Sequence, residues 1–266
     1  MNASAALGRA LITGASSGIG ATYAQRLAAQ GYDLLLVARD QARLEALAER
    51  LRAEAGVDVQ VLAADLTRRE DRARVEAAIA ADSAISLLLN NAGVAINGSL
   101  VDTDLERLES MIELNVTAMA RLAGSAAKAF SQRGRGTIIN LASVLALAPE
   151  LFNGAYSATK AFVLNLSLSM QQELAPHGVR VQVVLPGATR TEIWDRSGTG
   201  IDTLPAEIMM DVEDMVDAAL AGLAQGEVVT LPALPDMAQF QAYTQARQQM
   251  GPNLSLRRPA ARYGVA

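Results

Sequence analysis

Tyr156 and Lys160, four residues apart, are the side chains of this 266-residue chain whose types and spacing best suit acid–base chemistry. Residues at i and i+4 lie on the same face of a helix, so both can reach one substrate atom. An ammonium beside a phenol favours the phenolate, and lowering a tyrosine pKa from about 10 by about 3 units needs roughly 4 kcal/mol. We therefore expect this pair to act as an acid–base group near neutral pH.

The pair is one of four motifs that occur in a fixed order. Residues 13–20 read Thr-Gly-Ala-Ser-Ser-Gly-Ile-Gly, residues 90–93 read Asn-Asn-Ala-Gly, and Ser143 precedes the tyrosine by 13 residues. From about Arg9 to about Leu231, this set resembles the single-domain short-chain dehydrogenase/reductase family. The resemblance implies a doubly wound, Rossmann-like parallel α/β sheet with helices on both faces. It also implies an enzyme that transfers a hydride between a nicotinamide dinucleotide and a carbonyl or secondary alcohol. The alternative is a catalytically idle dinucleotide-binding redox sensor, against which the presence of both Tyr156 and Lys160 argues.

The same resemblance assigns roles to four residues. Tyr156 donates the proton during carbonyl reduction, and Lys160 lowers its pKa and binds the nicotinamide ribose; a cationic nicotinamide ring adds to this effect on the pKa. Ser143 binds the substrate oxygen, and Asn115 positions a water in the proton relay behind the lysine. Asparagine is unfavourable inside a helix, which supports a special role for Asn115, although an exposed polar residue is the alternative interpretation.

Three glycines, Gly14, Gly18 and Gly20, follow an expected strand and open an expected helix. Glycine permits a tight turn there and lets backbone N–H groups approach a pyrophosphate at the helix N-terminus. Their spacing differs from the general dinucleotide fingerprint but is the usual one in this family. A structural turn without a ligand is the alternative. We assign three more positions of this turn to the cofactor: Ser16, Ser17 and Ile19.

The choice between NAD and NADP depends on the end of the second strand. An acid there binds the ribose 2′-hydroxyl of NAD, whereas an arginine accommodates the 2′-phosphate of NADP. Asp40 lies 20 residues beyond Gly20 and by a simple count favours NAD. By resemblance, however, the strand-end position is Ala38, and Arg39 matches the arginine of NADP-dependent members. We therefore predict NADP(H), with NAD as the alternative if Arg39 is only a solvated charge.

Three further segments match cofactor-contacting positions of the family. Asp65 and Leu66 match the contact with adenine at the end of the third strand. The turn behind the adenosine ribose is matched by Asn91, Ala92 and Gly93, although packing alone explains Asn91 equally well. The segment that embraces the nicotinamide and its phosphates is matched by Pro186, Gly187, Thr189 and Thr191.

The substrate pocket is less determined by the sequence. Residues 144–153 are mostly apolar and should border it, and residues 187–210 form a loop long enough to be a substrate lid. From these segments we assign Leu145, Asn153, Ile193 and Trp194 to the pocket. We expect an apolar ketone, aldehyde or secondary alcohol as substrate. Core packing explains some of these residues equally well, and a disordered surface insertion is the alternative for the loop.

Composition excludes several other classes of function. The chain has 23 basic and 28 acidic residues, a net charge of −5 and no basic stripe, so we expect no nucleic-acid partner. With no cysteine it has no disulfide, and with a single histidine, His177, we expect no transition-metal site. No signal-peptide core and no apolar run of 18 residues occurs, so we expect a cytoplasmic protein without a membrane partner.

Short runs rich in Val, Ile and Leu alternate with helical patterns, which predicts βαβ units with right-handed crossovers. The expected strands are 10–13, 34–38, 59–63, 87–90, 137–141, 181–185 and 228–231. The expected helices are 20–30, 42–55, 69–80, 105–130 and 155–174, followed by an amphipathic stretch at 237–250.

We expect one catalytic and cofactor-binding domain, residues 1–235, and a C-terminal helical extension with a tail, residues 236–266. The two long helices, 105–130 and 155–174, carry more apolar residues than one contact with a sheet needs. Members of the family commonly pair these helices across a two-fold axis, so we predict a homodimer or a homotetramer. The residues behind this expectation are Met119, Leu122, Phe130, Phe162, Leu166 and Met170.

Overall fold

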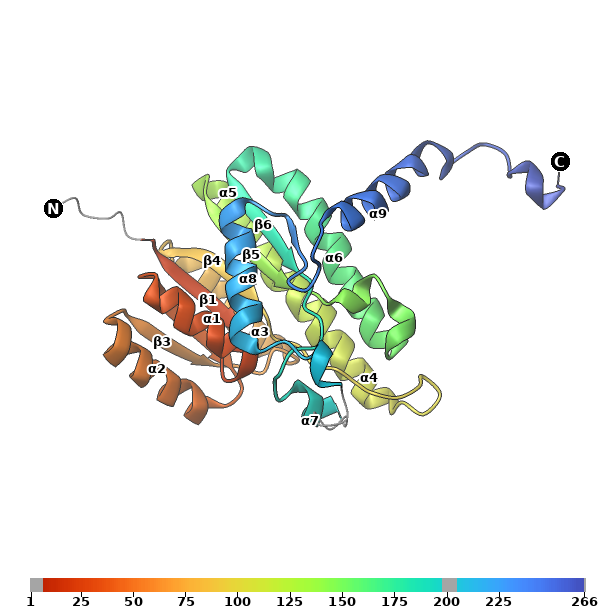
Figure 1. Cartoon of the computed structure of the whole chain (residues 1–266). Coiled ribbons are helices and arrows are strands. Elements are labelled where there is room, and N and C mark those ends of the chain that lie inside the picture. The colour runs from red at the N-terminus through yellow and green to blue at the C-terminus, as the bar shows by residue number, and fades with distance from the viewer. Residues whose placement is uncertain (1–6, 198–204, 266) are drawn as a thin grey trace. The chain divides into compact units, whose positions relative to one another are not determined.

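The computed structural model contains one sheet of seven parallel strands in the order β3-β2-β1-β4-β5-β6-β7 (Figure 1). The structure describes residues 7–197 and 205–265. The strand order runs outward in opposite directions from β1 and β4, and such a switch point opens a crevice at the carboxyl ends of the strands. The expected doubly wound fold is confirmed. The strands are β1 (Arg9–Thr13), β2 (Asp33–Ala38), β3 (Val59–Ala63), β4 (Ile85–Asn90), β5 (Gly136–Leu141), β6 (Val179–Val184) and β7 (Val229–Thr230).

Helices cover both faces of this sheet (Figure 1). The expected helices are present with ends shifted by a few residues, whereas α7 and α8 were not assigned from the sequence. The first lies within the loop predicted at 187–210, where Gly, Thr, Ser and Asp interrupt the periodic pattern, and the second follows that loop. The helices are α1 (Gly18–Ala29), α2 (Gln41–Ala55), α3 (Arg69–Ala81), α4 (Leu105–Ile112), α5 (Met119–Arg133), α6 (Gly154–Leu174), α7 (Ile193–Ser197), α8 (Val212–Gln225) and α9 (Ala238–Gln249).

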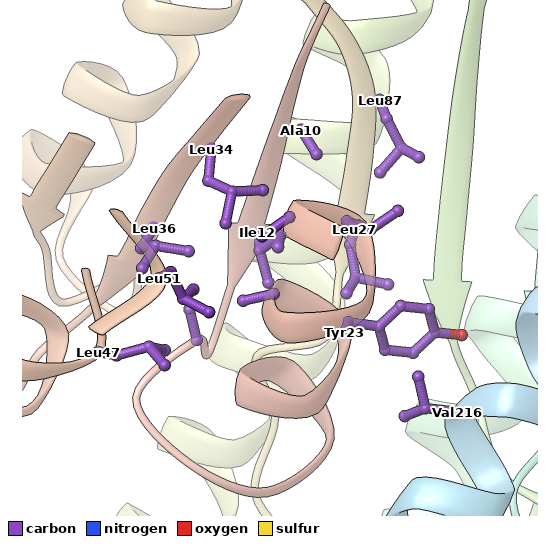
Figure 2. Close-up of a cluster of buried hydrophobic side chains, with 14 of the residues drawn as sticks. Ala10, Ile12, Tyr23, Leu27, Leu34, Leu36, Leu47, Leu51, Leu87 and Val216 are labelled. Carbon is purple, nitrogen blue, oxygen red and sulfur yellow. The ribbon is translucent and has the colours of Figure 1, made fainter. Parts of the chain in front are cut away.

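One face of the sheet packs against α1, α2 and α8 in a continuous apolar core. Alternate strand residues point into it because successive side chains of a strand lie on opposite faces. Figure 2 shows Leu34 and Leu36 of β2 on this face, with Tyr23 of α1 beside Val216 of α8. The Tyr23 ring is fully buried, and its hydroxyl has no hydrogen-bond partner among the described residues. This burial raises the pKa of Tyr23 well above its ordinary value.

The predicted single helix at 105–130 is interrupted. A π-helix, Glu113–Ala118, separates α4 from α5 and contains Asn115. Such π-turns are rare and are frequently found at functional sites. The periodicity of apolar residues does not reveal this turn, because the pattern continues through it on both sides.

The apolar residues of the two long helices are mostly used within the chain. Met119, Leu122, Phe130 and Met170 are buried, and only Phe162 is substantially exposed. Most of these residues are therefore covered within one copy of the chain. An oligomer built on these helices stays a prediction, and the residues offered for it no longer carry it.

Contacts within the chain divide it into two compact units, one ending at Pro232 and the other beginning at Ala233. The second unit contains α9 and two short 3₁₀ turns, and none of its described residues is buried. The predicted domain boundary at 235/236 stays a prediction. Within the described residues, no helix has the length and apolar character needed to cross a membrane.

Candidate active site

The glycine-rich turn between β1 and α1 is built for close approach of backbone. Gly14 and Gly18 have φ of +66° and +51°, which a side chain disfavours. At Gly20 a Cβ would collide with the carbonyl oxygen of Gly14 and would lie 2.5 Å from Asn91 Nδ2. Glycine is therefore required at this position whether or not a ligand binds. The turn brings the start of α1 to the carboxyl edge of the sheet.

The first turn of α1 has no side-chain cap, like those of α3 and α8 and unlike those of α2, α4 and α6. Asp40, Asp104 and Asn153 accept backbone N–H groups at the starts of those three helices, but Ser17 makes no such side-chain bond at the start of α1. The first amides of a helix lack intrahelical partners and carry partial positive charge. The start of α1 therefore offers donors that suit a pyrophosphate.

Thr13, which the sequence did not single out, holds the turn at residues 91–92. Its Oγ1 accepts the backbone N–H groups of Asn91 and Ala92, each at 3.0 Å, while Asn91 Nδ2 donates to the carbonyl oxygen of Thr13 at 2.9 Å. The carboxyl ends of β1 and β4 are thereby joined. These bonds support the packing interpretation of Asn91, and its predicted contact with ribose stays a prediction.

At the end of β2, the two neighbouring residues Arg39 and Asp40 are used differently. The Asp40 carboxylate caps α2 by accepting the N–H of Arg43 at 3.0 Å, and it also forms an ion pair with that side chain. Arg39 is exposed and makes no hydrogen bond or ion pair with any residue in 7–197 or 205–265. Asp40, the acid favoured by a simple count, is therefore engaged in capping α2, whereas Arg39 is available to bind a ligand.

Asp65 and Leu66 follow β3 at the same edge. Asp65 Oδ1 accepts both the N–H and the hydroxyl of Thr67, at 3.0 and 2.7 Å, and Leu66 is buried. Arg72 of α3 donates to the carbonyl oxygens of Leu66 and Thr67 at 2.9 Å each and pairs with Glu113 at the start of the π-helix. The segment after β3 is thus tied to the helix that carries Asn115.

Ser143, Tyr156 and Lys160 come together at the carboxyl end of β5 and the start of α6. All three are buried, and the hydroxyl of Ser143 accepts the N–H of Leu145 at 3.2 Å. Lys160 Nζ donates to the carbonyl oxygen of Leu141 at 2.9 Å and lies 5.8 Å from the centroid of the Tyr156 ring. The spacing of four residues therefore places both side chains on one face, as expected.

The pKa of the tyrosine moves in the direction opposite to the sequence-based expectation. Burial raises the pKa of Tyr156 to about 12, against the opposing effect of the hydrogen bond with Ser143. Burial also lowers the pKa of Lys160 to about 8. Desolvation disfavours every charged form in this apolar setting, so the side chains of the protein alone keep the phenol protonated.

Asn115 is buried beneath the lysine, with its amide fully engaged. Its Oδ1 accepts the N–H of Val94 at 3.0 Å, and its Nδ2 donates to the carbonyl oxygen of Val94 and to Thr159 Oγ1. A Cβ at Gly93 would lie 3.2 Å from Asn115 Oδ1 and 3.6 Å from Lys160 Nζ. Asn115 therefore fastens the 93–94 segment beside Lys160; its role in a water relay stays a prediction.

Apolar side chains surround the tyrosine. Ile96 and Met111 are buried against Tyr156, with Leu145 and Phe152 packed on the same cluster. The Phe152 ring makes edge-to-face contacts with Tyr156, at 5.8 Å between centroids, and with Trp194, at 6.3 Å. Phe152 was not named as a pocket residue, although its position four residues before the tyrosine in an apolar segment was a usable signal.

Asn153 starts α6. Its Oδ1 accepts the N–H groups of Ala155 and Tyr156 at 3.0 Å each, and its Nδ2 donates to the carbonyl oxygen of Gly98 at 2.7 Å. These bonds make it a helix cap that positions the tyrosine. Its predicted place in the substrate pocket stays a prediction.

The loop after β6 is organised where the structure describes it; residues 198–204 of the predicted lid lie outside the described part. Thr189 and Met210 form a β-bridge, and Trp194 Nε1 donates to the carbonyl oxygen of Thr189 at 2.8 Å. The carbonyl oxygen of Pro186 accepts the N–H of Val144 at 3.0 Å, which ties the loop to the segment after Ser143.

The same loop reaches the first two helices at the carboxyl edge of the sheet. A Cβ at Gly18 would lie 3.2 Å from Thr191 Cγ2, and Glu192 forms an ion pair with Arg43 of α2 at 3.0 Å. Thr191 of this segment therefore faces the glycine-rich turn. Ile193, next along the chain, begins α7.

The described residues fit a dinucleotide. Uncapped amides lie at the start of α1, an unpaired arginine follows β2, and a buried tyrosine–lysine pair lies at the carboxyl end of β5. All belong to the edge where open α/β sheets bind ligands.

Comparison with known proteins supports this interpretation. A family model described as short chain dehydrogenase matches residues 9–201. An uncharacterized oxidoreductase of Staphylococcus saprophyticus is 32% identical over 217 residues, which are 81% of this chain and 91% of that protein.

Two solved structures are similar over nearly the whole chain. A short-chain dehydrogenase from Sphingobium yanoikuyae in complex with NADPH is 50% identical with a TM-score of 0.93, covering 95% of this chain and 98% of that one. The bulky-bulky ketone specific alcohol dehydrogenase from Comamonas testosteroni is 45% identical with a TM-score of 0.90, covering 97% and 99%.

Proposed function

The chain belongs to the short-chain dehydrogenase/reductase family, and from this premise we propose that it is an NADP(H)-dependent reductase of bulky ketones, with Tyr156 as its acid–base residue. That it is an oxidoreductase acting on CH–OH or C=O groups with a nicotinamide cofactor follows from the family itself. The proposal concerns the choice of cofactor, the catalytic residues and the substrate class. The observation that carries it is the buried cluster of Ser143, Tyr156 and Lys160.

In the proposed reaction, bound NADPH supplies the hydride to the carbonyl carbon. Ser143 and Tyr156 donate hydrogen bonds to the carbonyl oxygen, where negative charge develops, and preorganised donors in a dry site stabilise such charge strongly. The proton of Tyr156 then moves to that oxygen. The burial that raises the pKa of Tyr156 to about 12 supports this direction, because the phenol holds its proton at neutral pH.

Lys160 acts on the tyrosine through its charge. Its ammonium lies 5.8 Å from the ring, close enough to stabilise the phenolate that remains after proton transfer. The carbonyl oxygen of Leu141 holds that ammonium in place. The remaining donors of the ammonium are suited to ribose hydroxyls of the cofactor.

The preference for NADP(H) is supported by the end of β2. Arg39 is exposed and unpaired among the described residues, whereas Asp40 is used as the cap of α2. A planar guanidinium suits a 2′-phosphate, and a capping carboxylate would have to leave its helix to bind a 2′-hydroxyl. The similar structure from Sphingobium yanoikuyae was solved with NADPH.

The substrate class is supported by the apolar surroundings of the tyrosine. Ile96, Leu145 and Phe152 pack around Tyr156 in one apolar cluster. Apolar surroundings of the tyrosine suit a ketone with large apolar substituents. The similar protein from Comamonas testosteroni is described as specific for such ketones.

The test is a panel of aryl and alkyl ketones with NADPH or NADH, followed by absorbance of the reduced nicotinamide. We expect turnover of bulky ketones with NADPH, and we expect Tyr156→Phe to lose nearly all of it while keeping affinity for NADPH. Tyr32→Phe, in the turn between α1 and β2 at the opposite edge of the sheet, is the control and should behave as the parent. Near-normal turnover of Tyr156→Phe would refute the acid–base assignment, and equal use of NADH would refute the cofactor preference.

A further inference from the structure

Exposed large apolar side chains are concentrated in two segments of the described chain. Of fourteen such residues, six lie in the C-terminal arm, which we define as residues 233–265, and four lie in the α4 segment, residues 100–112. Val101 is 94% exposed and Leu254 is 73% exposed. Apolar side chains left exposed together in one segment are typical of surfaces that bind another molecule. The residues are Leu100, Val101, Leu105 and Ile112 in the α4 segment, and Tyr243, Met250, Leu254, Leu256, Tyr263 and Val265 in the arm.

The two segments carry opposite charge. The arm has four arginines and one aspartate, a net charge of +3, although the whole chain has a net charge of −5. The α4 segment has two aspartates, two glutamates and one arginine, a net charge of −3, and all five are exposed. Complementary charge around apolar anchors is the pattern of a specific protein interface.

The arm is too small to be stable by itself. None of its described residues is buried, and chains below about 40 residues usually need a partner to supply a core. It is also not peculiar to this chain. A similar solved structure covers 95% of the chain, and the remaining 5% of 266 residues is about 13, fewer than the 34 residues from Ala233 to Ala266. That structure therefore has a counterpart of at least part of the arm.

We propose that the C-terminal arm of one copy of this chain docks on the α4 segment of a second copy. Apolar side chains such as Leu254 and Leu256 pack against Leu105 and Ile112, and the arginines of the arm pair with the carboxylates of α4. This contact gives both segments the apolar partner that they lack, and a contact of this kind is repeated across a two-fold axis.

The position of the α4 segment gives the contact a consequence for the site. Leu108 and Met111, on the inner side of α4, belong to the apolar cluster around Tyr156. The carbonyl oxygen of Gly98, just before the segment, accepts a hydrogen bond from Asn153, the cap of the catalytic helix. Docking of the arm therefore stabilises one wall of the active site of the other copy.

The absence of cysteine allows a direct test on the full chain. Ala261→Cys in the arm is labelled with a benzophenone maleimide and irradiated at micromolar concentration. We expect a cross-linked species of twice the 28.0 kDa chain mass on a denaturing gel, with the cross-link mapped to the α4 segment by mass spectrometry. Ala53→Cys, exposed on α2, is the matched control for random collision and should give no such species.

Charge reversal tests the complementarity of the two surfaces. Adding Arg257→Glu and Arg258→Glu to the labelled chain should remove most of the cross-linked dimer, whereas Arg50→Glu on α2 should not. Adding Glu106→Lys and Glu109→Lys to the variant with the charge-reversed arm should restore the cross-linked dimer. A misfolded variant could not show this recovery. Cross-links confined to single chains, cross-links to another surface, or no rescue by the charge swap would each overturn the proposal.

Discussion

Lys160 is a buried cation, and the effect of its burial on the free energy of unfolding can be measured. Its ammonium lies in an apolar setting, and burial lowers its pKa from 10.5 to about 8. This difference corresponds to about 3 kcal/mol between the protonation states. Below pH 8 the lysine is charged in both the folded and the unfolded chain, and the folded chain bears the full desolvation cost.

Replacing the lysine with methionine removes this titration while keeping an unbranched side chain. Between pH 8 and 10.5 the unfolded chain holds a proton on Lys160 that the folded chain has lost, so the stability of the parent rises with pH. The free energy of unfolding of the parent, minus that of Lys160→Met, should therefore increase by about 3 kcal/mol from pH 7 to pH 10.5. The variant also loses the hydrogen bond to the carbonyl oxygen of Leu141, which lowers its free energy of unfolding at every pH. This loss therefore cancels from the change with pH.

The measurement is urea unfolding of both proteins without cofactor, at pH 7, 8, 9, 10 and 10.5. Lys128→Met is the matched control, because Lys128 is the only other lysine and is exposed on α5. A difference between the parent and Lys160→Met that stays constant over this range would refute the reasoning, since it would mean that Lys160 does not lose its hydration on folding.

Four further outcomes follow from particular contacts. Gly20→Ala should lower both thermal stability and NADPH affinity, because its Cβ would meet backbone; a normal melting temperature would contradict the close approach. Phe152→Ala should raise KM for bulky ketones by about fivefold or more, from the loss of ring contacts of about 1 kcal/mol each, with NADPH affinity kept. Glu192→Gln should speed NADPH release by up to about fivefold, because an exposed ion pair such as that with Arg43 contributes at most about 1 kcal/mol. Adding Arg43→Gln to the Glu192→Gln variant should not speed release further. Trp194 fluorescence should change on addition of NADPH, and an unchanged spectrum at saturation would show that its loop does not respond to the cofactor.

Much of the fold can be predicted from local sequence patterns. Runs such as Leu34–Ala38 are apolar without alternation because a parallel strand is covered on both faces, and this distinguishes them from exposed strands. The glycines at 14, 18 and 20 and the pair Tyr156 and Lys160 also follow from local geometry, since turn conformation and helix spacing depend on neighbours in sequence. The fold class, the family and the residues that meet at the carboxyl edge were therefore accessible from the chain alone.

Other features depend on partners that are distant in sequence. The π-helix at Asn115 exists where that side chain is bonded to Val94 and Thr159, which no periodicity in 105–130 reveals. Thr13 gains its importance only from the turn at residues 91–92, and Phe152 only from the position of Trp194.

The protonation state of the catalytic pair was decided in the same way. Spacing alone places an ammonium beside a phenol and predicts a lowered tyrosine pKa, yet burial raises it. The Coulomb effect of a neighbour is local and can be expected from the sequence, whereas desolvation depends on every group that packs around the pair. Sequence thus determined which groups meet, and tertiary packing determined which charge state they hold, because only packing removes water from them.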